Sequence, residues 1–241
     1  MNRRARLATI VALFAVLAVP VVGLAQGATP VATDADGRVL PLDEPVFGAS
    51  YGEWAARNLQ WQLSFPDAIA PTYDETGARC GFGQAGPVWF LVGGDPASNT
   101  TRRCTVPAGV ALYLPLLGVS CSTIEPPPFF GRDEAELRAC AEGWVDRAPT
   151  VLAAALDGQP IAGLEGYRVP TPYFSVTFPG ENGYGVPAGT TGGFVGDGFS
   201  IILAPLPPGR HSLTFGSEVP DYGVAFRVTY ELTVEQPETI E

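Results

Sequence analysis

The chain of 241 residues has no lysine, a single histidine and only four cysteines. A histidine-activated serine or cysteine nucleophile would have only His211 as its base, no G-x-S-x-G motif is present, and the cysteines are expected to be oxidised. A zinc site needs closely spaced cysteines or several histidines, which the sequence does not offer. The 25 acidic residues outnumber the 14 basic ones and give a net charge of −11, which repels nucleic acid. We therefore expect no zinc centre, no histidine-dependent hydrolase and no nucleic-acid partner.

Long apolar runs are also scarce, and the longest lies at the N-terminus. Three arginines within residues 1–6 precede an apolar run over residues 7–22 and the small residues Gly23-Leu-Ala25. This layout is typical of a secretory signal peptide. A transmembrane anchor is the alternative, but Pro20 interrupts the run and no basic flank follows. We expect cleavage after residue 25, which leaves a secreted or cell-surface chain without a membrane span.

The mature chain is predicted to hold one folded region between two short flanks. Residues 26–46 are polar, contain proline and lack periodicity, so they predict a flexible N-terminal arm. Residues 47–236 are long enough for one large domain, and residues 237–241 form a C-terminal tail.

The central stretch from Cys80 to Cys121 carries the clearest structural signals. Two apolar runs, residues 87–92 and 110–117, predict strands covered on both faces. A polar, turn-rich segment separates them and suggests a hairpin-like unit. An even number of cysteines in an exported chain indicates two disulfides, with three possible pairings. We expect Cys80–Cys104 and Cys121–Cys140, because local turns bring each pair together.

The remaining pattern predicts two helices and about eight strands. Ser50 and Glu53 match a capping box that opens a helix through about Ser64, with Trp54 and Trp61 as core residues rather than a ligand platform. A second helix is expected over residues 133–146. Further strands are expected over residues 150–156, 173–178, 199–203, 211–215 and 224–234, with a turn at Asp157-Gly158 and a long glycine-rich loop over 180–198.

These elements indicate an all-β fold, a disulfide-bearing β-sandwich of jelly-roll or immunoglobulin-like type with one or two short inserted helices. His211 shares a strand face with Leu213 and Phe215. If this strand pairs with residues 224–234, His211 falls near Val228 or Tyr230. Burial there would favour the neutral imidazole, so we predict a structural role for His211.

Several short motifs together are similar to a family of uncharacterised secreted bacterial proteins. They are the tryptophan-bearing helix, Gly77-Ala-Arg-Cys80, Gly83-Gln-Ala-Gly-Pro-Val-Trp-Phe-Leu91, Arg103-Cys-Thr-Val-Pro-Ala-Gly109, Asp197-Gly-Phe199, Pro205-Leu-Pro-Pro-Gly-Arg-His211 and Thr229-Tyr-Glu-Leu-Thr-Val234. The resemblance covers nearly all of the mature chain. It implies export and one continuous domain, and it brings no catalytic residue with it.

Candidate functional residues lie in the predicted loops, where β-scaffolds often carry function. Loop aromatics could stack on a sugar or meet a partner surface: Tyr73, Phe82, Phe129, Phe130, Tyr184 and Tyr222. Asp95 and Asp197 are candidate calcium ligands, and no other cofactor is expected. A further set of loop acids could serve a glycosidase-like reaction: Asp74, Glu75, Asp95, Asp197 and Asp221.

We predict a secreted or cell-surface β-sandwich that binds a ligand, a polysaccharide or a partner protein without catalysis. The alternative is an extracellular carboxylate-based hydrolase or lyase that acts on a polysaccharide. That chemistry requires two carboxylates facing each other across one pocket, roughly 5–10 Å apart. The sequence leaves the oligomeric state open.

Overall fold

The computed structural model describes residues 38–94, 99–147 and 150–236. The predicted signal peptide (1–25) and C-terminal tail (237–241) lie outside these ranges. Within them the chain forms α1 (Tyr51–Leu63), β1 (Val88–Phe90), β2 (Asn99–Val106), β3 (Ala111–Ser122), α2 (Glu134–Asp146), β4 (Val151–Leu156), β5 (Gln159–Pro160), β6 (Phe174–Thr177), β7 (Thr191–Leu203), β8 (Gly209–Val219) and β9 (Val224–Val234). No helix among the described residues is long and apolar enough to cross a membrane.

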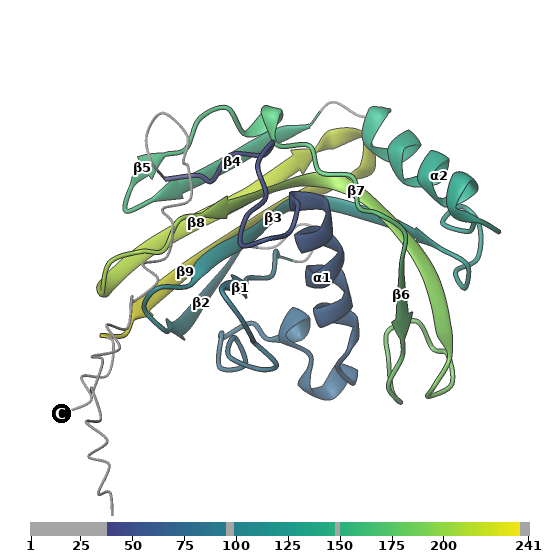
Figure 1. Ribbon diagram of the computed structural model, residues 1–241, viewed down its shortest axis with the longest axis horizontal. Helices are drawn as coiled ribbons and strands as arrows, with labels where there is room; N and C mark the ends of the chain where they lie inside the picture. The colour runs from purple at the N-terminus through teal and green to yellow at the C-terminus, as the bar shows by residue number, and fades with distance from the viewer. Residues whose placement is uncertain (1–37, 95–98, 148–149, 237–241) are drawn as a thin grey trace, which may run out of the picture. The chain divides into compact units, whose positions relative to one another are not determined.

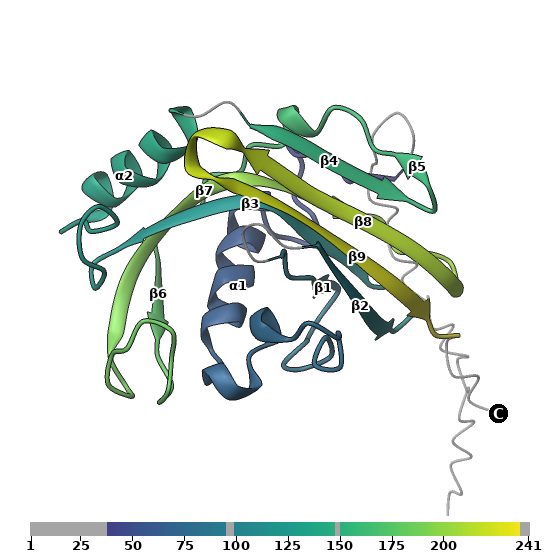
Figure 2. The ribbon, with the colours of Figure 1, turned by 180° about the vertical axis from the view of Figure 1, so that it is seen from behind.

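The strands form two sheets that pack face to face, which confirms the predicted disulfide-bearing β-sandwich (Figure 1). The four-stranded sheet has the order β1-β3-β7-β6, and the five-stranded sheet has the order β2-β9-β8-β4-β5. A shared apolar core joins them, with Leu112 and Leu114 from one sheet and Phe215 and Tyr230 from the other. Helix α1 lies against the opposite face of the four-stranded sheet (Figure 2).

Strand β3 is covered on both faces, as its unbroken apolar run predicted. Leu112 and Leu114 pack between the sheets, whereas Ala111 and Tyr113 pack toward α1. The alternation follows from the pleat of the strand, which points successive side chains to opposite faces. The molecule therefore has three layers at this point: the five-stranded sheet, the four-stranded sheet and α1.

The predicted hairpin between residues 87–92 and 110–117 is wrong. Strands β1 and β3 pair in parallel, and β2, which lies between them in sequence, pairs in parallel with β9 in the other sheet. The sequence concealed β2 because Arg102 occupies one of its inward positions, beside Cys104 and Val106. A charged residue at that position made an alternating strand resemble a polar loop.

Helix α1 begins as predicted, because Ser50 and Glu53 form a complete capping box. Both tryptophans of the helix are buried. Trp54 donates its indole hydrogen to the Val46 carbonyl at 2.7 Å, and Trp61 donates to the Phe82 carbonyl at 2.8 Å. Their predicted role in the core is thus confirmed, with each polar ring nitrogen satisfied.

The two disulfides pair as predicted. Cys80–Cys104 ties the loop before β1 to β2, and Cys121–Cys140 ties the end of β3 to α2. Helix α2 starts at the N-cap Asp133 and buries Leu137 and Ala141 next to the second disulfide.

The predicted loop over residues 180–198 is wrong from Thr191 onward, where β7 begins. Its glycines do not mark turns. A Cβ atom on Gly193 would collide with the Tyr173 hydroxyl, and one on Gly198 would collide with the Leu117 carbonyl oxygen. Glycine at these strand positions allows neighbouring chain segments to approach the strand closely. The turn at Asp157-Gly158 does form, with positive φ at both residues.

The described part of the predicted flexible arm, residues 38–46, packs on the four-stranded sheet. Val39 forms a β-bridge with Leu203, and the Leu40 amide donates to the Ile202 carbonyl at 2.8 Å. Val39 and Leu40 are both buried. This part of the chain is therefore an integral part of the folded domain.

The outer edge of β1 is capped by a side chain. Gln84 donates through Nε2 to the Phe90 carbonyl at 2.8 Å and accepts through Oε1 from the Phe90 amide at 3.0 Å. A single amide group thereby forms the pair of hydrogen bonds that a neighbouring strand would form.

His211 lies on β8 and shares a face with Leu213 and Phe215, but its predicted partners are wrong because the β8–β9 register places it opposite Leu232. Its Nδ1 lies 2.8 Å from Asp157 Oδ2 and its Nε2 lies 2.9 Å from the Pro207 carbonyl. Burial lowers the pKa of His211, but the hydrogen bonds to Asp157 and Pro207 and the Asp157 charge outweigh it and raise the pKa. The environment therefore favours the charged imidazole, not the neutral one.

Candidate functional site

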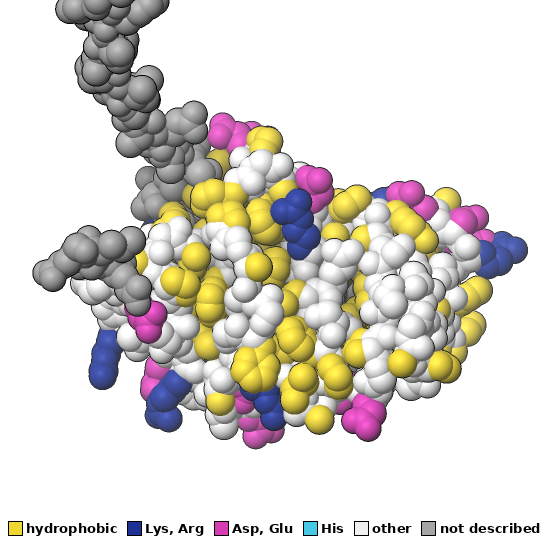
Figure 3. Space-filling model, turned by 60° about the horizontal axis from the view of Figure 1, so that its bottom comes forward, with side chains coloured by type: hydrophobic (Ala, Val, Ile, Leu, Met, Phe, Trp, Pro, Cys, Tyr) yellow, Lys and Arg dark blue, Asp and Glu magenta, His cyan; other side chains and the backbone are white. Residues whose placement is uncertain are grey.

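A groove runs between α1 and the edge of β3, and we call it the α1–β3 groove. It encloses about 360 Å³. Its walls are the α1 side (Ala55, Asn58, Leu59, Gln62 and Thr72), the β3 segment Pro115–Ser120 without Leu116, the β7 segment Gly196–Ser200 without Phe199, Gly93-Gly94, Tyr113, Val169, Thr171, Val224 and Phe226. In the space-filling view toward α1, hydrophobic and uncharged side chains form the middle of the face, and most charged side chains lie toward its rim (Figure 3).

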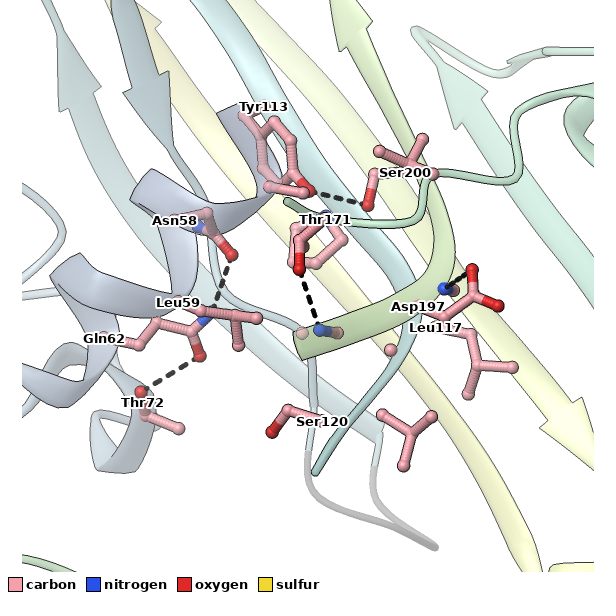
Figure 4. A pocket seen from close by; sticks show the side chains of 18 of the residues that line it. Asn58, Leu59, Gln62, Thr72, Tyr113, Leu117, Ser120, Thr171, Asp197 and Ser200 are labelled. Carbon is pink, nitrogen blue, oxygen red and sulfur yellow. Dashed lines mark hydrogen bonds between the residues drawn. The ribbon is translucent and has the colours of Figure 1, made fainter. Parts of the chain in front are cut away.

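Neutral hydrogen-bonding side chains line both walls of the groove (Figure 4). On the α1 side, Gln62 donates to Asn58 Oδ1 at 2.7 Å, and Thr72 lies 3.4 Å from Gln62 Oε1. On the sheet side, Tyr113 donates to Ser200 at 2.7 Å. Burial raises the pKa of Tyr113, so its hydroxyl stays protonated at any physiological pH. These side chains thus offer a ligand neutral amide and hydroxyl groups.

Asn58 is the least satisfied of these polar residues. Its side chain is buried in α1, yet Nδ2 has no hydrogen-bond partner among the described residues. Leaving a buried amide hydrogen unpaired costs about 1–3 kcal/mol. An acceptor atom in the groove, from an ordered water or from a bound ligand, would satisfy this hydrogen.

Asp197 is the only carboxylate among the described residues that line the groove. Its side chain is 1% exposed and forms an ion pair with Arg168, which also contacts Asp146 at 2.6 Å. The Gly198 amide donates to Asp197 Oδ1 at 2.8 Å. The carboxylate oxygens are therefore engaged by a guanidinium and by a backbone amide. Asp95, the other candidate calcium ligand, lies outside the described residues, and within them no cluster of three metal-binding side chains occurs.

The other predicted acids do not gather at the groove. Asp74 is buried and accepts hydrogen bonds from the Thr76 hydroxyl at 2.7 Å and from the Arg79 amide at 2.7 Å. Burial raises its pKa, but these bonds outweigh that effect and lower the pKa overall. Asp74 therefore organises its own loop. Glu75 is exposed in that loop, and Asp221 lies in the 3-10 turn Pro220–Tyr222.

The six predicted loop aromatics do not form one surface. Tyr73 and Tyr184 line a smaller hollow of about 160 Å³, which shares Leu59, Gln62 and Thr72 with the groove. Tyr184 packs on Phe178 and Phe194, and burial together with Glu125 raises the pKa of Tyr184 to about 12. Of the six predicted aromatics, the structure brings these two tyrosines next to the groove.

The remaining predicted aromatics lie elsewhere. Phe129 stacks on Trp144 with ring centroids 5.1 Å apart, and Tyr222 meets the same ring edge-on at 5.1 Å. Phe130 and Phe82 are exposed. Trp144, on α2, is thus the centre of a small aromatic cluster that includes two of the predicted residues.

Sequence reasoning did not find the polar residues of the groove. One signal was available: Asn58 interrupts the apolar stripe of α1 that contains Trp54, Ala55 and Trp61. Thr171 and Ser200 come from separate segments, and only the folded sheet brings them to one place.

No family model and no curated protein matches this chain. Among solved structures, a match is found with the structure described as PbICP-C in complex with falcipain-2. The identity is 10%, the match covers 62% of this chain and 100% of that chain, and the TM-score is 0.27. A TM-score of that size supports no conclusion about shared fold or function, so the functional argument depends on the groove itself.

Proposed function

We propose that this protein is an exported binding module and that its ligand occupies the α1–β3 groove. The observation that carries the proposal is the unpaired Asn58 Nδ2, which lines a groove whose other polar side chains are neutral amides and hydroxyls, apart from the Asp197 carboxylate that Arg168 holds. Such groups orient a ligand and reject wrong ones, because any unpaired member lowers affinity. The ligand is therefore an uncharged, hydrogen-bonding segment of a polysaccharide or a polypeptide.

Binding without catalysis agrees better with the groove than hydrolysis does. A glycosidase-like reaction needs a second carboxylate facing the first, and Asp197 is the single carboxylate among the described lining residues. Asp197 is also held by Arg168, which leaves it poorly placed to transfer protons. His211, the sole histidine, is absent from the groove and pairs with Asp157.

Export is supported by the two disulfides, since such bonds persist in oxidising compartments. The basic and apolar N-terminal segment of the sequence supports the same compartment. The similarity to secreted bacterial proteins remains a proposal that agrees with both.

The test is a binding and hydrolysis screen on the chain from residue 26 onward, with a glycan array, polysaccharide substrates and a displayed library of random linear peptides, with and without calcium. Gly118→Phe should abolish binding to any hit without loss of stability, because a Cβ atom at Gly118 meets nothing within 4 Å and the ring would fill the groove. Gly166→Phe is the matched control, since Gly166 is equally open but lies outside the groove. Hydrolysis of a substrate that Gly118→Phe blocks, or a hit unaffected by Gly118→Phe, would contradict the proposal.

A further inference from the structure

The edge of β7 that faces away from β3 is covered along its length by successive chain segments. Val39 bridges Leu203 at one end, and β6 pairs with residues Thr191–Phe194 at the other. Between them, the Val169 amide donates to the Gly198 carbonyl at 2.8 Å, and the Thr171 amide donates to the Gly196 carbonyl at 2.8 Å. Irregular segments thus complete the pairing where regular strands do not reach.

On the opposite edge of the same sheet, formed by β3, the described residues provide backbone partners at the two ends only. Strand β1 pairs with Ala111–Tyr113. At the far end, the Ser122 amide donates to the Phe129 carbonyl and the Ser122 carbonyl accepts from Gly131. Between these two contacts, no described residue forms a backbone hydrogen bond to the outer side of Pro115–Ser120. This unpaired edge is the floor of the α1–β3 groove.

The direction of the unpaired groups follows from the period of the strand. Backbone groups on a strand point to alternate edges, so Ser120 and Gly118 point to the same edge as Ser122. The β-bulge between Pro115 and Leu117 lies within the open segment and inserts one residue, so the next outward-pointing residue after Pro115 is Gly118. On the other side of the bulge, Pro115 follows Tyr113, whose carbonyl accepts from the Leu91 amide on that edge. The open edge therefore presents the Gly118 and Ser120 amides and the carbonyls of Pro115, Gly118 and Ser120.

The residues along this edge leave room for another extended chain at the distance that separates paired strands. Proline is found at sheet edges because it has no amide hydrogen to leave unpaired, and Pro115 occupies such a position. Gly93, Gly94 and Gly118 keep side chains away from the edge. The open segment spans roughly 15 Å, enough for about four residues of an extended chain.

We propose that the open edge of β3 between Pro115 and Ser120 binds an extended segment of a partner protein as an additional strand. This proposal rests on the proposed binding function and names the ligand class of the same groove. Main-chain amides and carbonyls that alternate along a strand match another polypeptide backbone. Sugar hydroxyls do not repeat in that pattern. The edge is also recessed between α1 and Phe226, so a single extended segment fits better than the edge of a second folded copy.

The two faces of the sheet set the sequence that the bound strand should prefer. Side chains on one face would meet Asn58 and Gln62, and those on the other would approach Val224 and Phe226. Alternate positions along a strand occupy opposite faces. The preferred segment therefore alternates uncharged polar residues with apolar ones.

The experiment selects linear peptides from a displayed random library against the chain from residue 26 onward and then methylates each peptide-bond nitrogen of a selected peptide in turn. We expect methylation to weaken binding at least about tenfold at every second position, the equivalent of losing one main-chain hydrogen bond. We also expect slower hydrogen exchange of the Gly118 and Ser120 amides in the complex. Gly118→Pro should weaken binding to a similar extent, and Gly118→Ala, which retains the amide hydrogen, should not.

Failure of this inference is distinguishable from failure of the proposed function. Peptides or glycans that bind in the groove and are blocked by Gly118→Phe, but without alternating sensitivity to methylation, would overturn strand addition and leave the binding function intact. Two further results would also overturn strand addition by a partner. One is peptide binding that appears only after residues 26–37 are removed, and the other is self-association that Gly118→Pro abolishes.

Discussion

The guanidinium of Arg102 donates a hydrogen bond to the Tyr230 hydroxyl at 3.2 Å. Both residues are buried, and they are directly paired on the neighbouring strands β2 and β9. The same side chain donates to the carbonyls of Asp74, Val92 and Gly93 at 2.6–3.0 Å. One buried cation therefore joins β2, β9 and the loops that lead to the α1–β3 groove.

Replacement of Arg102 by methionine should lower the free energy of unfolding by about 3 kcal/mol or more, because several buried carbonyls lose a charged donor at once. Arg103→Met, one position along the same strand, should change it by less than about 1 kcal/mol, since Arg103 pairs with Glu231 on the surface. Urea unfolding of both variants measures the difference. Equal losses for the two variants would show that Arg102 is not the organising residue of this region.

The pair formed by His211 and Asp157 should make stability depend on pH. The pKa of His211 is raised in the fold, so its contribution is complete below the unfolded pKa of about 6.5 and is lost as pH rises through the folded value. For Asp157, burial raises the pKa, but the His211 and Ser212 hydrogen bonds outweigh it and lower the pKa. Its contribution is therefore present above about pH 3.8 and is lost as pH falls through the folded value.

We accordingly expect the pair to contribute most between about pH 4 and 6.5. His211→Gln should reduce the thermal midpoint at about pH 5.5 and change it much less at about pH 8.5. Thermal unfolding of both proteins at the two pH values measures this. An equal reduction at both values would mean that the charge on His211 contributes nothing.

Asn58→Leu should raise the free energy of unfolding by about 1 kcal/mol, because removing a buried amide with an unpaired Nδ2 outweighs the loss of the hydrogen bond that half-buried Gln62 donates to Asn58 Oδ1. The same variant should weaken binding of any ligand of the groove. Asn182→Leu is the contrasting variant, since Asn182 Nδ2 donates to Pro179 and Val186 at 2.8 Å. It should lower the free energy of unfolding by about 2 kcal/mol. If Asn58→Leu destabilises the protein as much as Asn182→Leu does, Asn58 has a structural role.

Removal of either disulfide should destabilise the fold by about 3 kcal/mol, since the bonds close loops of 24 and 19 residues in sequence separation. The double variants Cys80→Ser with Cys104→Ser, and Cys121→Ser with Cys140→Ser, should therefore unfold at lower urea concentrations. A disulfide variant with unchanged stability would indicate that the reduced unfolded chain already holds those segments together.

Local patterns were sufficient for elements that carry their own signals. The capping box at Ser50 and Glu53 predicted the start of α1, and the strict alternation of residues 224–234 predicted β9. The turn at Asp157-Gly158 was also readable, because few residues adopt positive φ.

Elements that depend on distant partners were not readable in this way. Arg102 concealed β2 because its donors are satisfied by carbonyls far away in sequence. Glycines concealed β7 because they mark close approaches of other segments, such as Tyr173 at Gly193. The open edge of β3 had no sequence signal, since it exists only where β1 ends before β3 does.

The side-chain amide of Gln84 prevents a further strand from adding to the outer edge of β1 at Phe90. Unpaired strand edges are templates on which identical chains assemble into aggregates. At Phe90 the backbone amide and carbonyl already form hydrogen bonds with the Gln84 side chain of the same molecule. Deamidation of Gln84 to glutamate would replace the donor with a negative charge against the Phe90 carbonyl. An aged or acid-treated sample should therefore begin to polymerise from the outer edge of β1 at Phe90, which the Gln84 amide covers in the intact protein.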